Sequence, residues 1–176
     1  YYRNISESHS VPLIDGKRQD ETGKASVIGF DSNDAEARVS IDLTDAYRDR
    51  AKQVTRDVAL TNLRKAVVVR DRYELTSHHD IVWAMTTDAD IAILPDGAAA
   101  LSLDGKKLIA RVIEPKGVAF VMESAERPGP EKPNKGVRRL LLRVNDATGN
   151  TNISVMLAPV WDDGAVESIE SKLLAN

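Results

Sequence analysis

Residues 65–93 read KAVVVRDRYELTSHHDIVWAMTTDADIAI, and this stretch decides the fold that the sequence predicts. The run at residues 66–69 is continuously apolar, as expected of a strand that is covered on both faces. A second β-rich run follows from Val82 and contains Trp83. Between the two runs, the polar residues 76–79 have the right length for a hairpin or a tight loop. We therefore expect this pair of strands to form the centre of a β-sandwich.

The composition is that of an ordinary globular protein with one core. A length of 176 residues suffices for one well-buried core and is short for two full domains, so we expect a single domain over residues 1–176. The net charge of −3 argues against sequence-independent nucleic-acid binding, because proteins of that class carry a basic surface. The chain has no cysteine, which excludes disulfides and thiolate metal sites, and no apolar run of 18 residues that would span a membrane.

Alternating apolar and polar residues predict further strands around the central pair. In residues 36–43, every second residue is apolar and shares one face. The same period returns in residues 52–60, where Arg56 interrupts the apolar face. The other predicted strands are residues 25–30, 98–103, 107–113, 117–123, 137–145 and 151–160. Short strands with frequent turns and no βαβ spacing predict an all-β fold, an antiparallel β-sandwich of about ten or more strands with little helix.

Loops and chain ends complete this prediction. Residues 127–136, RPGPEKPNKG, contain three prolines and two glycines, so we expect an exposed loop there. In residues 44–51 a helix competes with extended structure, but its amphipathic stripe is too short for a stable helix. Residues 166–174 predict a short C-terminal helix. The chain opens at Tyr1 without methionine or an apolar signal segment, and we expect it to be a piece of a longer protein.

The side chains that could carry chemistry are few. Adjacent His78 and His79 would point to opposite faces of a strand and could not chelate one ion together, so we interpret them as part of a solvated loop. No metalloprotease motif, nucleophile elbow, phosphate-binding loop or dinucleotide fingerprint is present, and we predict no catalytic residue. Trp83 is interpreted as a core residue. Trp161, which polar residues follow, is a candidate for stacking on a sugar face.

Two groups of charged residues on predicted strands are interpreted as salt-bridged surface rows. They are Arg70-Asp71-Arg72 in the central stretch and Arg138-Arg139 in the predicted strand at residues 137–145. Alternation along a strand would place neighbouring members of each row on opposite faces.

Four stretches, taken in order, resemble the C-terminal sandwich region of heparinase II/III-like polysaccharide lyases. The first combines Arg3, Ser8-His9 and a strand that ends in Asp15-Gly16. The others are residues 41–47 (IDLTDAY), 67–73 (VVVRDRY) and 81–85 (IVWAM). The resemblance covers most of the chain, in the order that the family shows.

The resemblance implies a fragment rather than a complete enzyme. Such lyases combine an N-terminal α/α toroid with a β-sandwich and cleave uronate-containing polysaccharides, such as glycosaminoglycans or alginate, by β-elimination. It implies that this chain is inactive alone and that its partners are the missing toroid and an acidic polysaccharide. From the net charge and the apolar pattern we expect neither a nucleic-acid partner nor a membrane span. It also implies a bacterial protein that is periplasmic or secreted.

The resemblance also assigns candidate site residues. Tyr2 and Arg3, which lie in the matching first stretch, are candidate substrate-binding residues, and Trp161 joins them from the residue pattern described above. His9 matches the last of three ligands of a structural metal ion, with zinc as the candidate, in the full-length protein. The other two ligands would lie before Tyr1, so we expect no cofactor in this chain itself. Two alternatives stay open, a carbohydrate-binding module that acts on its own and a sandwich that serves in protein contacts.

Overall fold

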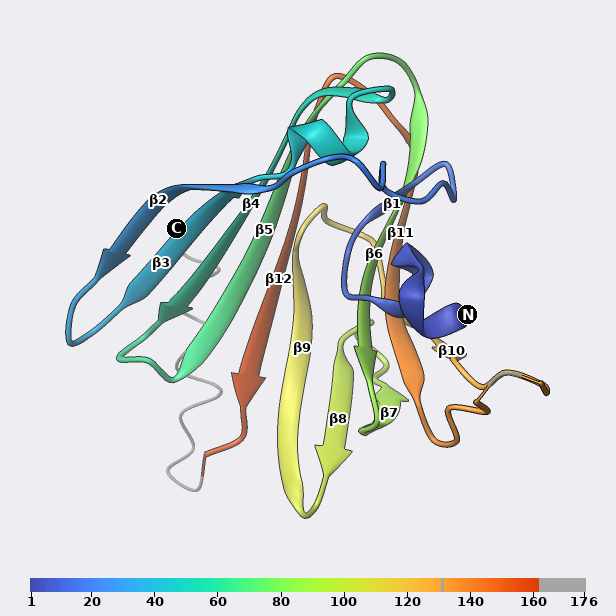
Figure 1. The fold of residues 1–176 in the computed structure, drawn as a ribbon. Helices are drawn as coiled ribbons and strands as arrows, with labels where there is room; N and C mark the ends of the chain where they lie inside the picture. The colour runs from blue at the N-terminus through green and yellow to red at the C-terminus, as the bar shows by residue number, and fades with distance from the viewer. Residues whose placement is uncertain (131, 162–176) are drawn as a thin grey trace.

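Two antiparallel β-sheets pack face to face in the computed structural model, which describes residues 1–130 and 132–161 (Figure 1). The four-stranded sheet contains β1 (Leu13–Ile14), β6 (His79–Thr87), β11 (Arg138–Ala147) and β10 (Val121–Ser124), in that spatial order. The eight-stranded sheet contains β2 (Ser26–Ser32), β3 (Ala37–Asp42), β4 (Ala51–Thr61), β5 (Ala66–Leu75), β12 (Asn150–Pro159), β9 (Lys106–Glu114), β8 (Ala99–Leu103) and β7 (Asp90–Ile93), also in spatial order. This confirms the predicted all-β antiparallel sandwich of ten or more strands.

Helical structure in the described ranges is limited to three short 3-10 turns, η1 (Tyr2–Asn4), η2 (Ser6–Ser8) and η3 (Thr44–Tyr47). The last of these occupies the place where a short helix competed in the sequence, and β4 follows directly after it. The helix predicted at residues 166–174 lies outside the described residues. Within the described part of the chain, no helix is long and apolar enough to cross a bilayer.

The core lies between the two sheets. Its largest fully buried side chains include Ile14, Tyr47, Ile81, Phe120, Leu140, Leu142, Ile153 and Val155. Trp83 is 3% exposed and its ring lies 6.2 Å from that of Phe120, so the interpretation of Trp83 as a core residue is confirmed. Burial of each large apolar side chain contributes about 1.5–3 kcal/mol to folding, which makes this shared core the main source of stability.

The central pair of strands is arranged differently from the expectation of a hairpin. β5 pairs with β4 and β12 in the larger sheet, whereas β6 pairs with β1 and β11 in the smaller one. The short connection between them therefore crosses from one sheet to the other. Tyr73 on β5 and Ile81 on β6 both point into the same core. The two strands therefore face each other across the core and do not pair as neighbours in one sheet.

Asp71 was expected in a surface row and is instead fully buried at 0% exposed. Arg56 on β4 donates from Nε and Nη2 to the two oxygens of its carboxylate, at 2.6 and 2.8 Å. The hydroxyl of Tyr73 donates to the same carboxylate at 3.3 Å, and burial raises the pKa of Tyr73 well above its usual value. The surface prediction for Asp71 was wrong because the matching interruption at Arg56 lies directly opposite it in the register.

Residues 1–18, which we call the N-terminal segment, are held to the sandwich through their backbone. Arg56 Nη1 donates to the carbonyl of Ser10 at 2.8 Å, and the Tyr47 hydroxyl donates to that of Pro12 at 2.8 Å. Arg50 donates to two further carbonyls, those of Ile14 and Arg18, at 3.2 and 3.1 Å. Because these donors are buried or partly buried, they fix the path of the segment across the smaller sheet (Figure 1).

Candidate functional site

An open depression of about 470 Å³ lies between the start of the N-terminal segment and the proline-rich loop at residues 127–136. It is lined by Tyr1, Tyr2, Ile5, Arg18, Arg127, Pro128, Gly129 and Pro130. The ring of Tyr1 is 87% exposed there. The depression therefore combines an accessible aromatic ring with two guanidinium groups, which suits contact with an anionic, ring-shaped ligand.

The two N-terminal residues predicted to bind substrate have different positions. Tyr2 is only 6% exposed, and the guanidinium of Arg127 lies 4.1 Å above the centre of its ring. Its ring face is thus occupied, and Tyr2 orients Arg127 toward the depression. Arg3 is exposed, and its Nε donates to Oδ1 of Asn134 at 2.6 Å, which ties the N-terminal segment to the proline-rich loop.

The electrostatic balance of this region is positive. Arg18 pairs with Glu7 at 3.3 Å. Over residues 1–130 and 132–161, Arg3 and Arg127 form no ion pair with a carboxylate. Exposed guanidinium groups without a carboxylate partner are available to an anionic ligand, and they attract one over roughly 10 Å at 0.1 M salt.

His9 is exposed, and the structure does not surround it with further metal ligands. The described residues contain no group of three or more His, Cys, Asp or Glu side chains that could hold a metal ion. A structural zinc site needs four ligands, so His9 by itself does not fit that ion.

The other two histidines lie at the start of β6 and are held by carboxylates. Nδ1 of His79 lies 2.8 Å from Oδ2 of Asp15, and its side chain is only 9% exposed, in contrast to the solvated loop predicted for it. The hydrogen bond with His79 lowers the pKa of Asp15 below its usual value. His78 lies 2.8 Å from Asp146 and remains 67% exposed, as predicted. These two histidine–carboxylate contacts therefore fix the connection between β5 and β6, which crosses from one sheet to the other.

Trp161 lies in a different part of the molecule. It is 42% exposed and its Nε1 donates to the carbonyl of Lys65 at 3.1 Å. With Lys106 and Lys107 it lines a separate depression of about 620 Å³ beside the end of β12. The structure thus does not bring Trp161 together with Tyr2 and Arg3, since the two depressions share no residue.

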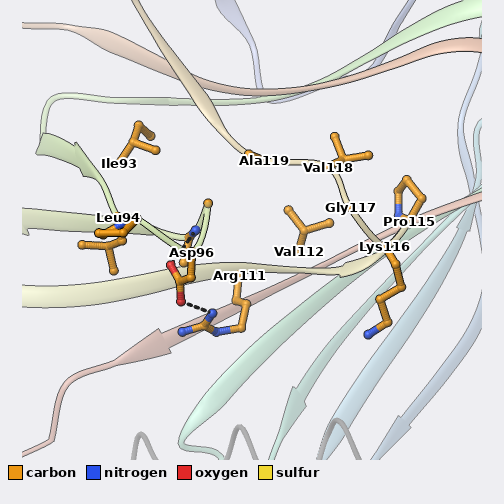
Figure 2. A pocket seen from close by; sticks show the side chains of 13 residues that line it. Ile93, Leu94, Asp96, Arg111, Val112, Pro115, Lys116, Gly117, Val118 and Ala119 are labelled. Atoms are coloured by element: carbon orange, nitrogen blue, oxygen red, sulfur yellow. Dashed lines mark hydrogen bonds and ion pairs between the residues drawn. The ribbon is translucent and has the colours of Figure 1, made fainter.

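A third hollow, shown in Figure 2, was not predicted from the sequence. It measures about 560 Å³ and lies between the turn at residues 94–98, β9 and the loop at residues 115–119. A strand was predicted at residues 117–123, but β10 begins only at Val121. Gly117 has a φ of +77°, a left-handed conformation that interrupts extended structure. The loop around it lines one side of this hollow and does not pair as a strand.

The turn and the loop that border this hollow are locked together. A Cβ added to Gly97 would lie 2.9 Å from that of Ala119, and the N–H of Phe120 donates to the carbonyl of Gly97 at 3.1 Å. Asp96 is the single carboxylate among the described residues that line it. It pairs with Arg111 at 2.7 Å, and this bond lowers the pKa of Asp96 (Figure 2). The hollow therefore offers no unengaged carboxylate that could act as a base.

No family model matches this sequence, and no curated protein does so either. Among solved structures, the chain is similar to the heparan sulfate lyase HepC from Pedobacter heparinus, with a TM-score of 0.71 and 14% identity over 86% of this chain and 24% of that one. A heparinase III with methylated lysines gives a TM-score of 0.71 and 14% identity over 90% of this chain and 24% of that one. A further heparinase III structure gives a TM-score of 0.66 and 12% identity, over 86% of this chain and 23% of that one.

The chain thus spans about a quarter of the length of the lyases that it resembles. At 12–14% identity the likeness establishes the fold and nothing finer. The described residues therefore have the fold of a β-sandwich region that occurs within heparan sulfate lyases of the heparinase III type.

Proposed function

We propose that this chain is the C-terminal β-sandwich domain of a heparinase II/III-like polysaccharide lyase and is inactive alone. The observation that carries this proposal is the match with a TM-score of 0.71 to 86% of this chain but only 24% of a heparan sulfate lyase. The remaining part of the protein, an α/α toroid, would supply the reactive groups. The substrate of the full-length protein would be an acidic polysaccharide, and its location periplasmic or secreted.

The chemistry of the reaction supports different roles for the toroid, which would supply the reactive groups, and for the sandwich, which would hold the substrate. β-Elimination next to a uronate needs neutralisation of the carboxylate, a base that removes the C5 proton and an acid for the leaving oxygen. The N-terminal depression contains arginines and tyrosines but no carboxylate or histidine among the described residues that line it. We therefore assign it the role of a cleft wall that holds the acidic chain through Arg18 and Arg127.

An exposed apolar strand supports a partner within the same polypeptide. On β2, Val27, Ile28 and Phe30 are 66%, 59% and 74% exposed. This strand is the edge of the larger sheet, and only one of its residues is partly buried. Apolar side chains on an unpaired edge strand favour association with another surface. In a longer lyase, the rest of the chain would cover this edge.

The proposal is tested with the isolated chain and heparan sulfate or alginate. We expect no increase in the ultraviolet absorbance of unsaturated uronate over hours at high protein concentration. A steady increase that scales with protein concentration would overturn the assignment of the reactive groups to another part of the protein. A second sample that also contains the upstream part of the polypeptide provides the positive control.

A carbohydrate-binding module that acts alone is the second candidate, and the exposed ring of Tyr1 beside Arg127 favours it. A module of this kind would be retained on immobilised heparan sulfate at physiological salt. Substitution Arg127→Ala would then release it, whereas Arg38→Ala, on β3 of the larger sheet, would not. Passage of the unmodified chain without retention supports the lyase domain instead.

A further inference from the structure

Arg139 lies on the outward face of the smaller sheet and is nevertheless 9% exposed. Its neighbours Leu140 and Leu142 belong to the core, so Arg139 points to the opposite face. The register places it directly opposite Thr86 on β6. The N-terminal segment runs beside the edge of β6 here, because the N–H of Thr86 donates to Oγ of Ser10 at 3.1 Å. Arg139 is therefore a buried arginine on the face of the smaller sheet that points away from the core.

This buried guanidinium has no hydrogen-bond partner within the described residues. Its Nε and Nη2 are both buried and unpartnered, and so is Oγ1 of Thr86 across the strand pair. Glu123 is the residue opposite Arg139 on β10, but its carboxylate forms no ion pair with Arg139. The Glu123 carboxylate pairs with Arg143 at 2.5 Å instead. Burial of a charge without a counter-charge is costly, so two adjacent unpartnered groups indicate a ligand.

The chemistry of that ligand follows from the atoms that are unpartnered. Nε and Nη2 form one edge of the guanidinium fork, and this edge matches two oxygens of a carboxylate or sulfate. Arg56 provides the internal comparison, because the same two atoms there hold both oxygens of the Asp71 carboxylate at 2.6 and 2.8 Å. At Arg139 no carboxylate among residues 1–130 and 132–161 takes the corresponding position.

We propose that Arg139 and Thr86 form a binding site for an oxyanion, a sulfate or carboxylate group, on the outward face of the smaller sheet. The Arg139 edge donates two hydrogen bonds to the ligand, and the Thr86 hydroxyl donates a third. Arg3, which is exposed on the N-terminal segment, adds positive charge to this end of the molecule. The group is either a free anion or part of an acidic saccharide, and only the second source rests on the proposed function.

Thermal unfolding of the chain in sodium sulfate and in sodium chloride of equal ionic strength tests the site. We expect sulfate to raise the melting temperature of the wild type along a saturating curve. In Arg139→Met the sulfate affinity falls at least tenfold, and in Thr86→Val it falls several-fold. Arg143→Met is the matched control, because Arg143 lies on the same strand and face but is paired, and it keeps the wild-type response.

A second readout separates the site from a merely structural arginine. In sulfate-free buffer, Arg139→Met should melt at or above the wild-type temperature, because the substitution removes an unpartnered buried charge and keeps the packing. A lower melting temperature would show that the guanidinium has a partner inside the protein and would overturn the proposal. Equal sulfate responses of the wild type and Arg139→Met would overturn it as well.

The source of the oxyanion is distinguished with two further probes. A sulfated heparan disaccharide and its desulfated counterpart, which keeps the uronate, are each titrated against the wild type and Arg139→Met. Binding of a disaccharide tighter than that of sulfate, and dependent on Arg139, assigns the site to the saccharide. Binding of inorganic sulfate alone assigns it to a free anion and leaves the lyase proposal to the elimination assay.

Discussion

Replacement of Asp71 by asparagine removes the charge that the largely buried Arg56 depends on. Asp71 is 0% exposed, and Arg56 is 15% exposed along its side chain. Asparagine keeps the size of the side chain but can no longer accept two charged hydrogen bonds and balance the guanidinium. The variant thus leaves Arg56 as an uncompensated charge in the core region, which is the costly way to break a buried pair.

The expected loss follows from the bonds that are broken. Two hydrogen bonds to a charged group, at about 1.5–3 kcal/mol each, indicate a loss of several kcal/mol. Removal of one partner from a buried ion pair costs about 3–5 kcal/mol. We therefore expect Asp71→Asn to lower the free energy of unfolding by about 4 kcal/mol. For a chain of this length, this corresponds to a decrease in melting temperature of about 8–16 °C.

Urea denaturation measures this loss, with Glu74→Gln as the matched control. Glu74 lies on the same strand and pairs with Lys52, but both side chains are about half exposed or more, at 45% and 68%. An exposed pair of this kind is worth about 0–1 kcal/mol. Arg56 also holds the carbonyl of Ser10, so limited proteolysis of the N-terminal segment should be faster in Asp71→Asn. Similar losses in the two variants would refute the reasoning.

Three further predictions concern pH, backbone conformation and surface association. Side-chain hydrogen bonds lower the pKa of Asp15 and Asp42, so their stabilising contributions are complete above about pH 4 and are lost as the pH falls through the folded values. The urea midpoint should decrease from pH 5 to pH 3, and a constant midpoint would contradict this. Gly97→Ala combines a positive φ with a steric clash and should cost about 1–3 kcal/mol, clearly more than Gly117→Ala, which has open space around it. Equal costs would show that the close approach is unimportant. Phe30→Lys should change stability by no more than about 0.5 kcal/mol and reduce self-association in light scattering, and unchanged scattering would argue against β2 as a contact edge.

The alternation of apolar residues predicted the strands and the core position of Trp83, because both depend on local periodicity. It did not predict that β5 and β6 belong to different sheets. A short connection is compatible with a hairpin and with a crossover, and the choice depends on which neighbours pair with each strand. That information lies far away in the sequence, since β5 pairs with the C-terminal β12.

Polar residues on strands were the main source of wrong site predictions. Arg56 interrupted an apolar face, and Asp71 interrupted another, and only the register shows that the two interruptions meet. A search for opposite charges on the inward positions of adjacent predicted strands would have found this pair. Arg139 was assigned to a salt-bridged surface row, and this prediction was wrong because its side chain is buried and its Nε and Nη2 have no partner within the described residues. Its burial depends on residues far apart in the sequence and leaves no local signal.

The domain assignment is tested most directly by the reading frame upstream of Tyr1. The account predicts several hundred codons with the helical periodicity of an α/α toroid, joined in frame to the sandwich and carrying near the junction the two metal ligands that the resemblance places before Tyr1. A start codon immediately before Tyr1 would contradict it, because the β-sandwich would then not be the C-terminal domain of a longer lyase.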